Sequence, residues 1–248
     1  MEVSVRAIHF GLNKYPAGNA LSKCVADARD MAKLFGGKLI LDGDATAAAI
    51  VDLGTKCIEG AGPGETVVVT YSGHGTQLDD NDGDEPDQVD EAIVGIDLEC
   101  VRDDIVAIML AKLHSQARGL LIADSCFSGT IQRAMPSFHP SHTDQLRRRG
   151  VRYIAPEFVH QPRRKVANVG PQAGLANWVI ISGCADFEVS YEGRRNGVLS
   201  GAFKAAYSRT QSIYSIFTRA AKLVSGESWP QHPQITCSAA ARKWVFAK

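Results

Sequence analysis

With 248 residues, 45% of them hydrophobic and 22% charged, the chain has the size and composition of a globular protein with one large core. It holds no apolar run near the roughly 18 residues of a transmembrane helix, and its first residues lack the basic and apolar regions of a secretory signal. Its zero net charge gives no argument for binding nucleic acid or a membrane. We therefore expect a cytoplasmic protein with neither kind of partner. Our expectation for the oligomeric state is a monomer, although nothing in the sequence determines it.

The six cysteines are spread along the chain without any CxxC pair. Disulfide scaffolds belong to shorter, cysteine-dense secreted chains, and zinc sites need closely spaced ligand pairs. The sequence therefore predicts reduced thiols, most of them small core residues.

Charge is unevenly distributed in spite of the neutral total. Residues 78–104 carry 12 acidic side chains against the single base Arg102, and residues 141–165 carry seven basic side chains against two acidic ones. The two blocks could pair with each other, or the acidic block could bind a cation.

Hydrophobic periodicity predicts strands that alternate with helices. The strands are expected at residues 3–10, 39–41, 65–71, 118–123 and 178–182, and the helices at 19–36, 45–58, 103–114, 198–208 and 211–224. This alternation is typical of an α/β fold, with a mostly parallel sheet of about six strands flanked by helices on both faces. Residues 133–172 lack periodicity, and we interpret them as a basic loop or linker within a single domain of residues 1–248.

Two of the strands run into short motifs with reactive side chains. The strand at 65–71 leads into Ser-Gly-His74-Gly, and the strand at 118–123 leads into Asp-Ser-Cys126-Phe-Ser-Gly. Ligand sites in open parallel sheets lie beyond the carboxyl ends of the strands. A lone cysteine or histidine is usually structural, but the two motifs together predict a catalytic dyad.

Such a dyad has a simple chemistry. The imidazole of His74 would take the proton of the Cys126 thiol, which becomes a nucleophile, and would then protonate the leaving amine. The backbone N–H groups of Gly75 and Cys126 are the expected donors to the oxyanion that forms.

On these motifs the chain resembles the metacaspases, a family of caspase-like cysteine peptidases. Further matching segments lie in family order at residues 24–28, 82–91, 181–186, 201–203 and 233–234. The resemblance implies a caspase-like fold in which residues 1–132 form a large-subunit-like part with the dyad. Residues 133–172 would then be the linker, and residues 173–248 a small-subunit-like part.

The resemblance also implies polypeptide substrates that are cleaved after arginine or lysine, the P1 residue, by Cys126 as nucleophile and His74 as general acid–base. The P1 pocket would be formed by Cys24, Asp27, Ser72 and Asp124. A carboxylate beside the thiol would oppose thiolate formation, so Asp124 is a poor activator. Paired carboxylates are instead well suited to bind a guanidinium group. The alternative for Asp27 is that it only faces solvent on its helix.

Calcium activation is a further implication of the resemblance, with Asp90, Asp103 and Asp104 as ligands. Arg133 stands where the family usually supplies another carboxylate. That cation would repel calcium, or would replace it by pairing with the aspartates. The alternative is that the acidic block is only a solvated surface.

A peptidase with this preference would carry its own preferred residues in the basic loop. Exposed loops are where peptidases cut, so the loop offers candidate self-cleavage points at Arg147, Arg148, Arg149, Arg163, Arg164 and Lys165. The alternative is that the basic loop docks on the acidic block at 79–104.

The main hypothesis is therefore a calcium-stimulated, self-processing cysteine endopeptidase. One alternative is a catalytically inactive interaction module with a caspase fold. Another is a related peptidase with a different P1 preference.

Overall fold

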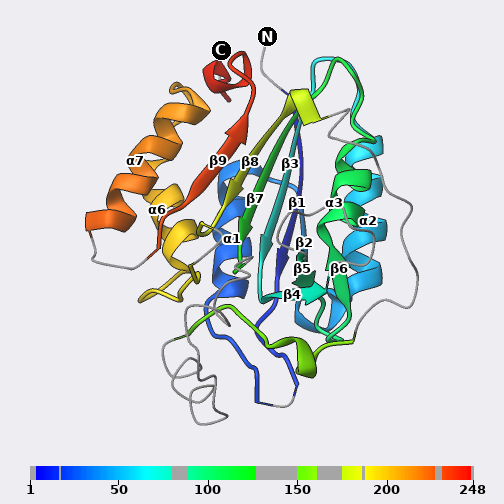
Figure 1. Cartoon of the computed structure of the whole chain (residues 1–248). Coiled ribbons are helices and arrows are strands. Elements are labelled where there is room, and N and C mark those ends of the chain that lie inside the picture. Colours follow the sequence, from blue (N-terminus) through cyan, green and yellow to red (C-terminus); the bar gives the residue numbers. More distant parts are fainter. Residues whose placement is uncertain are drawn as a thin grey trace.

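The computed structural model describes residues 4–16, 18–79, 89–126, 150–160, 175–185, 188–226 and 231–246. A six-stranded sheet forms its centre, and helices cover both faces of the sheet (Figure 1). The predicted α/β architecture is thus confirmed.

The central sheet has the strand order β2-β1-β3-β7-β8-β9. In this order the strands span Lys38–Leu41, Val5–Gly11, Thr66–Ser72, Arg118–Asp124, Trp178–Ser182 and Gln234–Cys237. The first five run parallel and lie close to the expected bounds, whereas β9 was not predicted and pairs antiparallel with β8 at the edge. Every residue of β3 is buried, as is typical of a central parallel strand.

Helices pack on both faces of this sheet. One face carries α1, α6 and α7, and the other carries α2 and α3 (Figure 1). Their bounds are Cys24–Phe35, Val198–Ala206, Ile213–Gly226, Ala47–Glu59 and Asp103–Leu110, respectively. All five predicted helices are present, and each face of the sheet has its own hydrophobic core.

The start of α1 differs from the sequence-based prediction, which placed it at residue 19. The helix begins at Cys24 because the side chain of Asn13 caps it from outside. The Oδ1 atom of Asn13 accepts the N–H groups of Cys24 at 2.9 Å and Val25 at 3.3 Å. Residues 19–23 thus precede the helix. The backbone oxygen of Asn19 lies 2.7 Å from His74 Nε2, just after β3, and the N–H groups of Ser22 and Lys23 donate to Glu192.

A second, antiparallel sheet was not predicted. It has the order β4-β5-β6, with bounds Gly75–Asp79, Val89–Val94 and Cys100–Arg102. Part of the acidic block therefore lies in strands, and Asp90 is only 5% exposed. The interpretation of the block as solvated surface is wrong for this residue.

The basic loop at 133–172 is described only at residues 150–160. The six candidate self-cleavage points and Arg133 lie outside the described residues. Within 150–160, the side chains of Val151, Arg152 and Ile154 are buried. This part of the loop is therefore packed into the protein, at the end of the sheet where the small sheet also lies (Figure 1).

In the part of the chain that the structure describes, no helix combines the length and the apolar character that a membrane span requires.

Candidate functional site

The two predicted motifs meet at the carboxyl ends of β3 and β7. The strands are neighbours, and Ser72 at the end of β3 pairs in register with Asp124 at the end of β7. His74 and Cys126 each follow two residues later. The backbone of Gly75 packs so closely on Cys126 that a Cβ atom added to Gly75 would lie 1.8 Å from the Cys126 carbonyl oxygen.

The imidazole of His74 is buried and oriented by residues that the sequence did not reveal. Its Nε2 atom lies 2.7 Å from the backbone oxygen of Asn19, and its ring contacts Tyr15 edge-on at a centroid distance of 4.6 Å. A carbonyl oxygen only accepts hydrogen bonds, so Nε2 carries the proton in the neutral ring. Nδ1 is then the basic nitrogen, which is the atom that a proton acceptor in catalysis needs.

The Cys126 thiol is completely buried. Its Sγ atom accepts the backbone N–H of Ser190 at 2.9 Å and lies 3.5 Å from the Ser190 oxygen. The thiol thus lies beside the chain segment that follows β8.

The four residues expected to form the P1 pocket are all buried on neighbouring elements, Cys24 and Asp27 on α1, Ser72 on β3 and Asp124 on β7. The Ser72 hydroxyl donates to Asp27 at 2.7 Å. Burial raises the pKa of the Cys24 thiol, so the acidic groups of the pocket that pair with a cation are the carboxylates of Asp27 and Asp124. Asp27 does not face solvent.

The guanidinium group of Arg152 fills this acidic pocket. Its Nη2 atom lies 2.6 Å from Asp27 Oδ2, and its Nη1 atom lies 3.1 Å from Asp124 Oδ2. Nη1 also donates to the Ser72 hydroxyl at 2.9 Å and to the Asp124 backbone oxygen at 2.8 Å. Burial acts to lower the pKa of Arg152, but the charges of Asp124 and Asp27 outweigh it and raise that pKa above its ordinary value.

The backbone of Arg152 occupies the predicted oxyanion site. Its carbonyl oxygen accepts the N–H of Gly75 at 2.9 Å and the N–H of Cys126 at 3.3 Å. The two backbone donors named from the sequence therefore converge on one oxygen atom. Arg152 belongs to the basic block, but its position in the pocket had no signal in the sequence.

Four further residues complete the pocket and were also missed. The Ser190 hydroxyl donates to Asp124 at 2.7 Å, and the backbone N–H of Ser200 donates to the same carboxylate at 2.8 Å. Asp27 accepts the Asn196 side-chain amide at 2.9 Å and the Gly197 N–H at 2.9 Å. Residues 196–200 surround the start of α6, and the only sequence signal nearby was the matched segment at 201–203.

The predicted calcium ligands do not form a metal site in this arrangement. The carboxylate of Asp90 makes a buried ion pair with Arg102, and the Arg102 side chain also donates to the Asp79 backbone oxygen at 3.2 Å. Asp103 and Asp104 form the first turn of α3. Among the described residues, no three metal-ligating side chains come together. The charge of Asp90 is compensated by the guanidinium group of Arg102.

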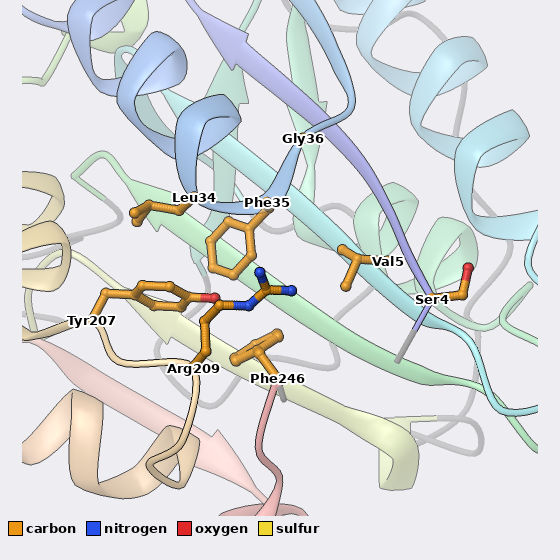
Figure 2. Close-up of a pocket in the computed structure, with 8 residues that line it drawn as sticks. All are labelled: Ser4, Val5, Leu34, Phe35, Gly36, Tyr207, Arg209 and Phe246. Carbon is orange, nitrogen blue, oxygen red and sulfur yellow. The ribbon is translucent and has the colours of Figure 1, made fainter. Parts of the chain in front are cut away.

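A separate pocket lies at the opposite end of the strands. It is lined by Val5 at the start of β1 and by Phe35, Tyr207, Arg209 and Phe246, as Figure 2 shows. A seven-residue strand rises roughly 20 Å, so this pocket is remote from the ends of β3 and β7. It belongs to a different region of the molecule from the predicted dyad.

The fold and the paired strand ends define a caspase-like protein, and comparisons with known proteins agree. The family model of the caspase domain matches residues 4–245, so the chain belongs to the caspase domain family. The structure of caspase-1 from Spodoptera frugiperda aligns with a TM-score of 0.65 and 13% identity over 100% of this chain and 91% of that chain, which shows the caspase-like fold. A Geobacter sulfurreducens protein structure aligns with a TM-score of 0.72 and 25% identity over 98% of both chains.

Within this family, the chain is similar to metacaspases. Metacaspase-1 of Kluyveromyces lactis is 25% identical and covers 94% of this chain, and metacaspase-2 of Trypanosoma brucei brucei is 27% identical and covers 85%. The chain spans 66% and 62% of these two relatives, respectively. It is thus distantly homologous to metacaspases over most of its length, which confirms the resemblance drawn from the motifs.

The contact between Gly75 and Cys126 generates a prediction. Gly75→Ala should destabilise the protein by about 1–3 kcal/mol, because the added methyl group collides with backbone that cannot rotate away. Gly43→Ala is the matched control, since a Cβ atom there meets nothing within 4 Å, and we expect a change below about 0.5 kcal/mol. Urea unfolding of both variants provides the measurement. Equal effects of the two substitutions would contradict the close packing of the two motifs.

Proposed function

We propose that the chain is a cysteine endopeptidase that cleaves polypeptides after arginine or lysine, with Cys126 as nucleophile and His74 as general acid–base. One observation carries the proposal. The guanidinium group of Arg152 is bound between Asp27 and Asp124, and the backbone carbonyl oxygen of Arg152 accepts the N–H groups of Gly75 and Cys126. The site therefore has the shape and charge to hold a basic residue with its carbonyl group at the thiol.

The proposed mechanism follows from these positions. His74 Nδ1 takes the thiol proton, and the sulfur attacks the carbonyl carbon of the P1 residue. The N–H groups of Gly75 and Cys126 stabilise the oxyanion, because they already converge on one carbonyl oxygen. The protonated imidazole then gives its proton to the leaving amine, and water hydrolyses the thioester. The Asn19 carbonyl oxygen keeps the His74 ring in the tautomer with the proton on Nε2, in which Nδ1 is the nitrogen that acts as the base in these steps.

Removal of either dyad member should abolish turnover. Cys126→Ala and His74→Ala should each lower kcat/KM for an arginyl peptide by at least about 1,000-fold, because the two groups act as a unit. Cys57→Ala and His114→Ala remove the same side chains outside the site and serve as matched controls. Circular dichroism verifies that all four variants fold. A wild-type chain without any turnover would instead favour the inactive interaction module.

The acidic pocket predicts a strong preference at P1. With one peptide series that differs only at P1, arginine and lysine should be cleaved at least about 100-fold better than aspartate, since like charges in a buried site cost several kcal/mol. Asp27→Asn should reduce this preference, whereas Asp52→Asn on the exposed side of α2 should not. Comparable kcat/KM values for arginine and aspartate peptides would refute the assignment of the pocket.

We also propose that calcium stimulates the enzyme, as the metacaspase resemblance implies, and that Arg102 controls how tightly calcium binds. Calcium should bind wild type only weakly, in the micromolar-to-millimolar range, because Arg102 already holds Asp90. Arg102→Gln should tighten calcium binding by at least about tenfold, since it frees a carboxylate, and Asp90→Asn should weaken it. Calorimetry in a Cys126→Ala background is the measurement. If neither wild type nor Arg102→Gln binds calcium, these acids are not a calcium site.

A further inference from the structure

Residues 150–154 lie across the candidate site as a bound peptide would. On one side they pair antiparallel with residues 190–192, through the bridge between Val151 and Tyr191. The Arg152 N–H donates to the Ser190 oxygen at 3.0 Å, and the Glu192 N–H donates to the Gly150 oxygen at 2.8 Å. Pairing of an extended segment with an exposed strand edge is a common mode of peptide recognition.

On the other side the same segment pairs with the start of β4. The Gly75 N–H donates to the Arg152 oxygen at 2.9 Å, and the Ile154 N–H donates to the Gly75 oxygen at 3.0 Å. Tyr153 thereby forms a parallel bridge with Gly75. The segment is thus held on both sides of the peptide bond that joins Arg152 to Tyr153.

The register of the segment places that one bond at the thiol. The Ser190 oxygen lies within 3.0 Å of the Arg152 nitrogen and within 3.5 Å of Cys126 Sγ, so the sulfur lies beside the Arg152 backbone. The Arg152 carbonyl oxygen is in the oxyanion site while its side chain is in the acidic pocket. A residue that only balanced the charges of Asp27 and Asp124 would not need its carbonyl group in that position.

The segment also closes the site. Cys126 has no exposed surface and lies in a hydrophobic cluster with Val151, with Tyr153 packed against the same cluster. His74 is only 4% exposed. An external polypeptide cannot reach the thiol or the acidic pocket while residues 150–154 remain in place.

We propose that residues 150–154 are an internal substrate of the chain's own site, with Arg152 as the P1 residue and Arg152–Tyr153 as the bond that is cut in self-processing. This inference rests on the proposed peptidase activity. Cys126 would form a thioester with the Arg152 carbonyl carbon as the bond to the Tyr153 nitrogen breaks, and His74 would protonate that nitrogen. Water then releases the Arg152 carboxylate and regenerates the thiol. External substrates gain access only after this cut.

The first test asks whether Arg152 occupies the pocket, and it needs no activity. Agmatine, a small amine with a guanidinium group, is titrated into two full-length chains, Cys126→Ala and Cys126→Ala/Arg152→Ala. The control chain is Cys126→Ala/Lys204→Gln, which loses a cation outside the pocket. We expect binding at least about tenfold tighter to the Arg152→Ala chain than to the other two. Equal binding to all three chains, or binding to none, would overturn the proposal. Because Arg152→Ala leaves two buried carboxylates unpaired, that chain is prepared in agmatine, which is removed by dialysis before the titration. The second test does not depend on this variant.

The second test maps the cut. Full-length wild type, incubated and analysed by mass spectrometry of its new termini, should yield a fragment that ends at Arg152 and one that begins at Tyr153. The rate should not depend on protein concentration, since the substrate is in the same chain. Arg152→Lys should still be cut after position 152, Arg152→Gln should not, and Cys126→Ala should stay intact.

Two outcomes separate this proposal from the proposed function. If wild type cleaves arginyl peptides while its Arg152–Tyr153 bond stays whole, residues 150–154 are not an internal substrate, and the proposed function still stands. If wild type cleaves neither, while the three Cys126→Ala chains bind agmatine as expected, the peptidase function has failed and the assignment of Arg152 to the pocket has not.

Discussion

A buried guanidinium group between two carboxylates is the interaction on which the site depends. Arg152, Asp27 and Asp124 are each no more than 1% exposed. Charges removed from water cost several kcal/mol each unless they are paired and hydrogen-bonded, so each of the three requires the other two. The carboxylates come from α1 and β7, and the guanidinium group from the loop after β7, so this one interaction ties together three separate parts of the fold.

Two carboxylates and one guanidinium group leave an excess of negative charge, and the start of α6 offsets it. The backbone N–H groups of Gly197 and Ser200 point at Asp27 and Asp124, respectively. A helix N-terminus carries a partial positive charge, which favours anions placed there. The pocket is therefore electrostatically prepared for one cationic side chain, and an arginine of the same chain fits that requirement.

Much of this could be predicted from local patterns in the sequence. The apolar runs of β3 and β7 predicted two strands, and the glycine-containing motifs after them located His74 and Cys126. The family motifs added Asp27 and Asp124.

Residues that reach the site from distant segments of the chain left no such pattern in the sequence. Asn19 orients His74 through its backbone oxygen, and Ser190 contacts the thiol through backbone atoms, so their side-chain types give no clue to either role. Arg152 stood in a basic loop without periodicity, and nothing local distinguished it from Arg147 or Arg163. The helix start at Cys24 depends on a cap from Asn13, which is likewise a contact between separate segments.

The most direct test of the central claim is a double-mutant cycle on stability, made in the Cys126→Ala chain so that no cleavage interferes. Asp27→Asn keeps the shape of the side chain and removes its charge, and Arg152→Gln replaces the guanidinium group with a shorter, neutral polar side chain. If the buried ion pair is present, Arg152→Gln should destabilise the protein by about 3–5 kcal/mol in urea unfolding, because it leaves both carboxylates uncompensated. Asp27→Asn should cost less, because Arg152 stays paired with Asp124. The double variant should then lose much less than the sum of the two. Additivity within about 0.5 kcal/mol would show that the two side chains do not interact, and Arg152 would not lie in the acidic pocket.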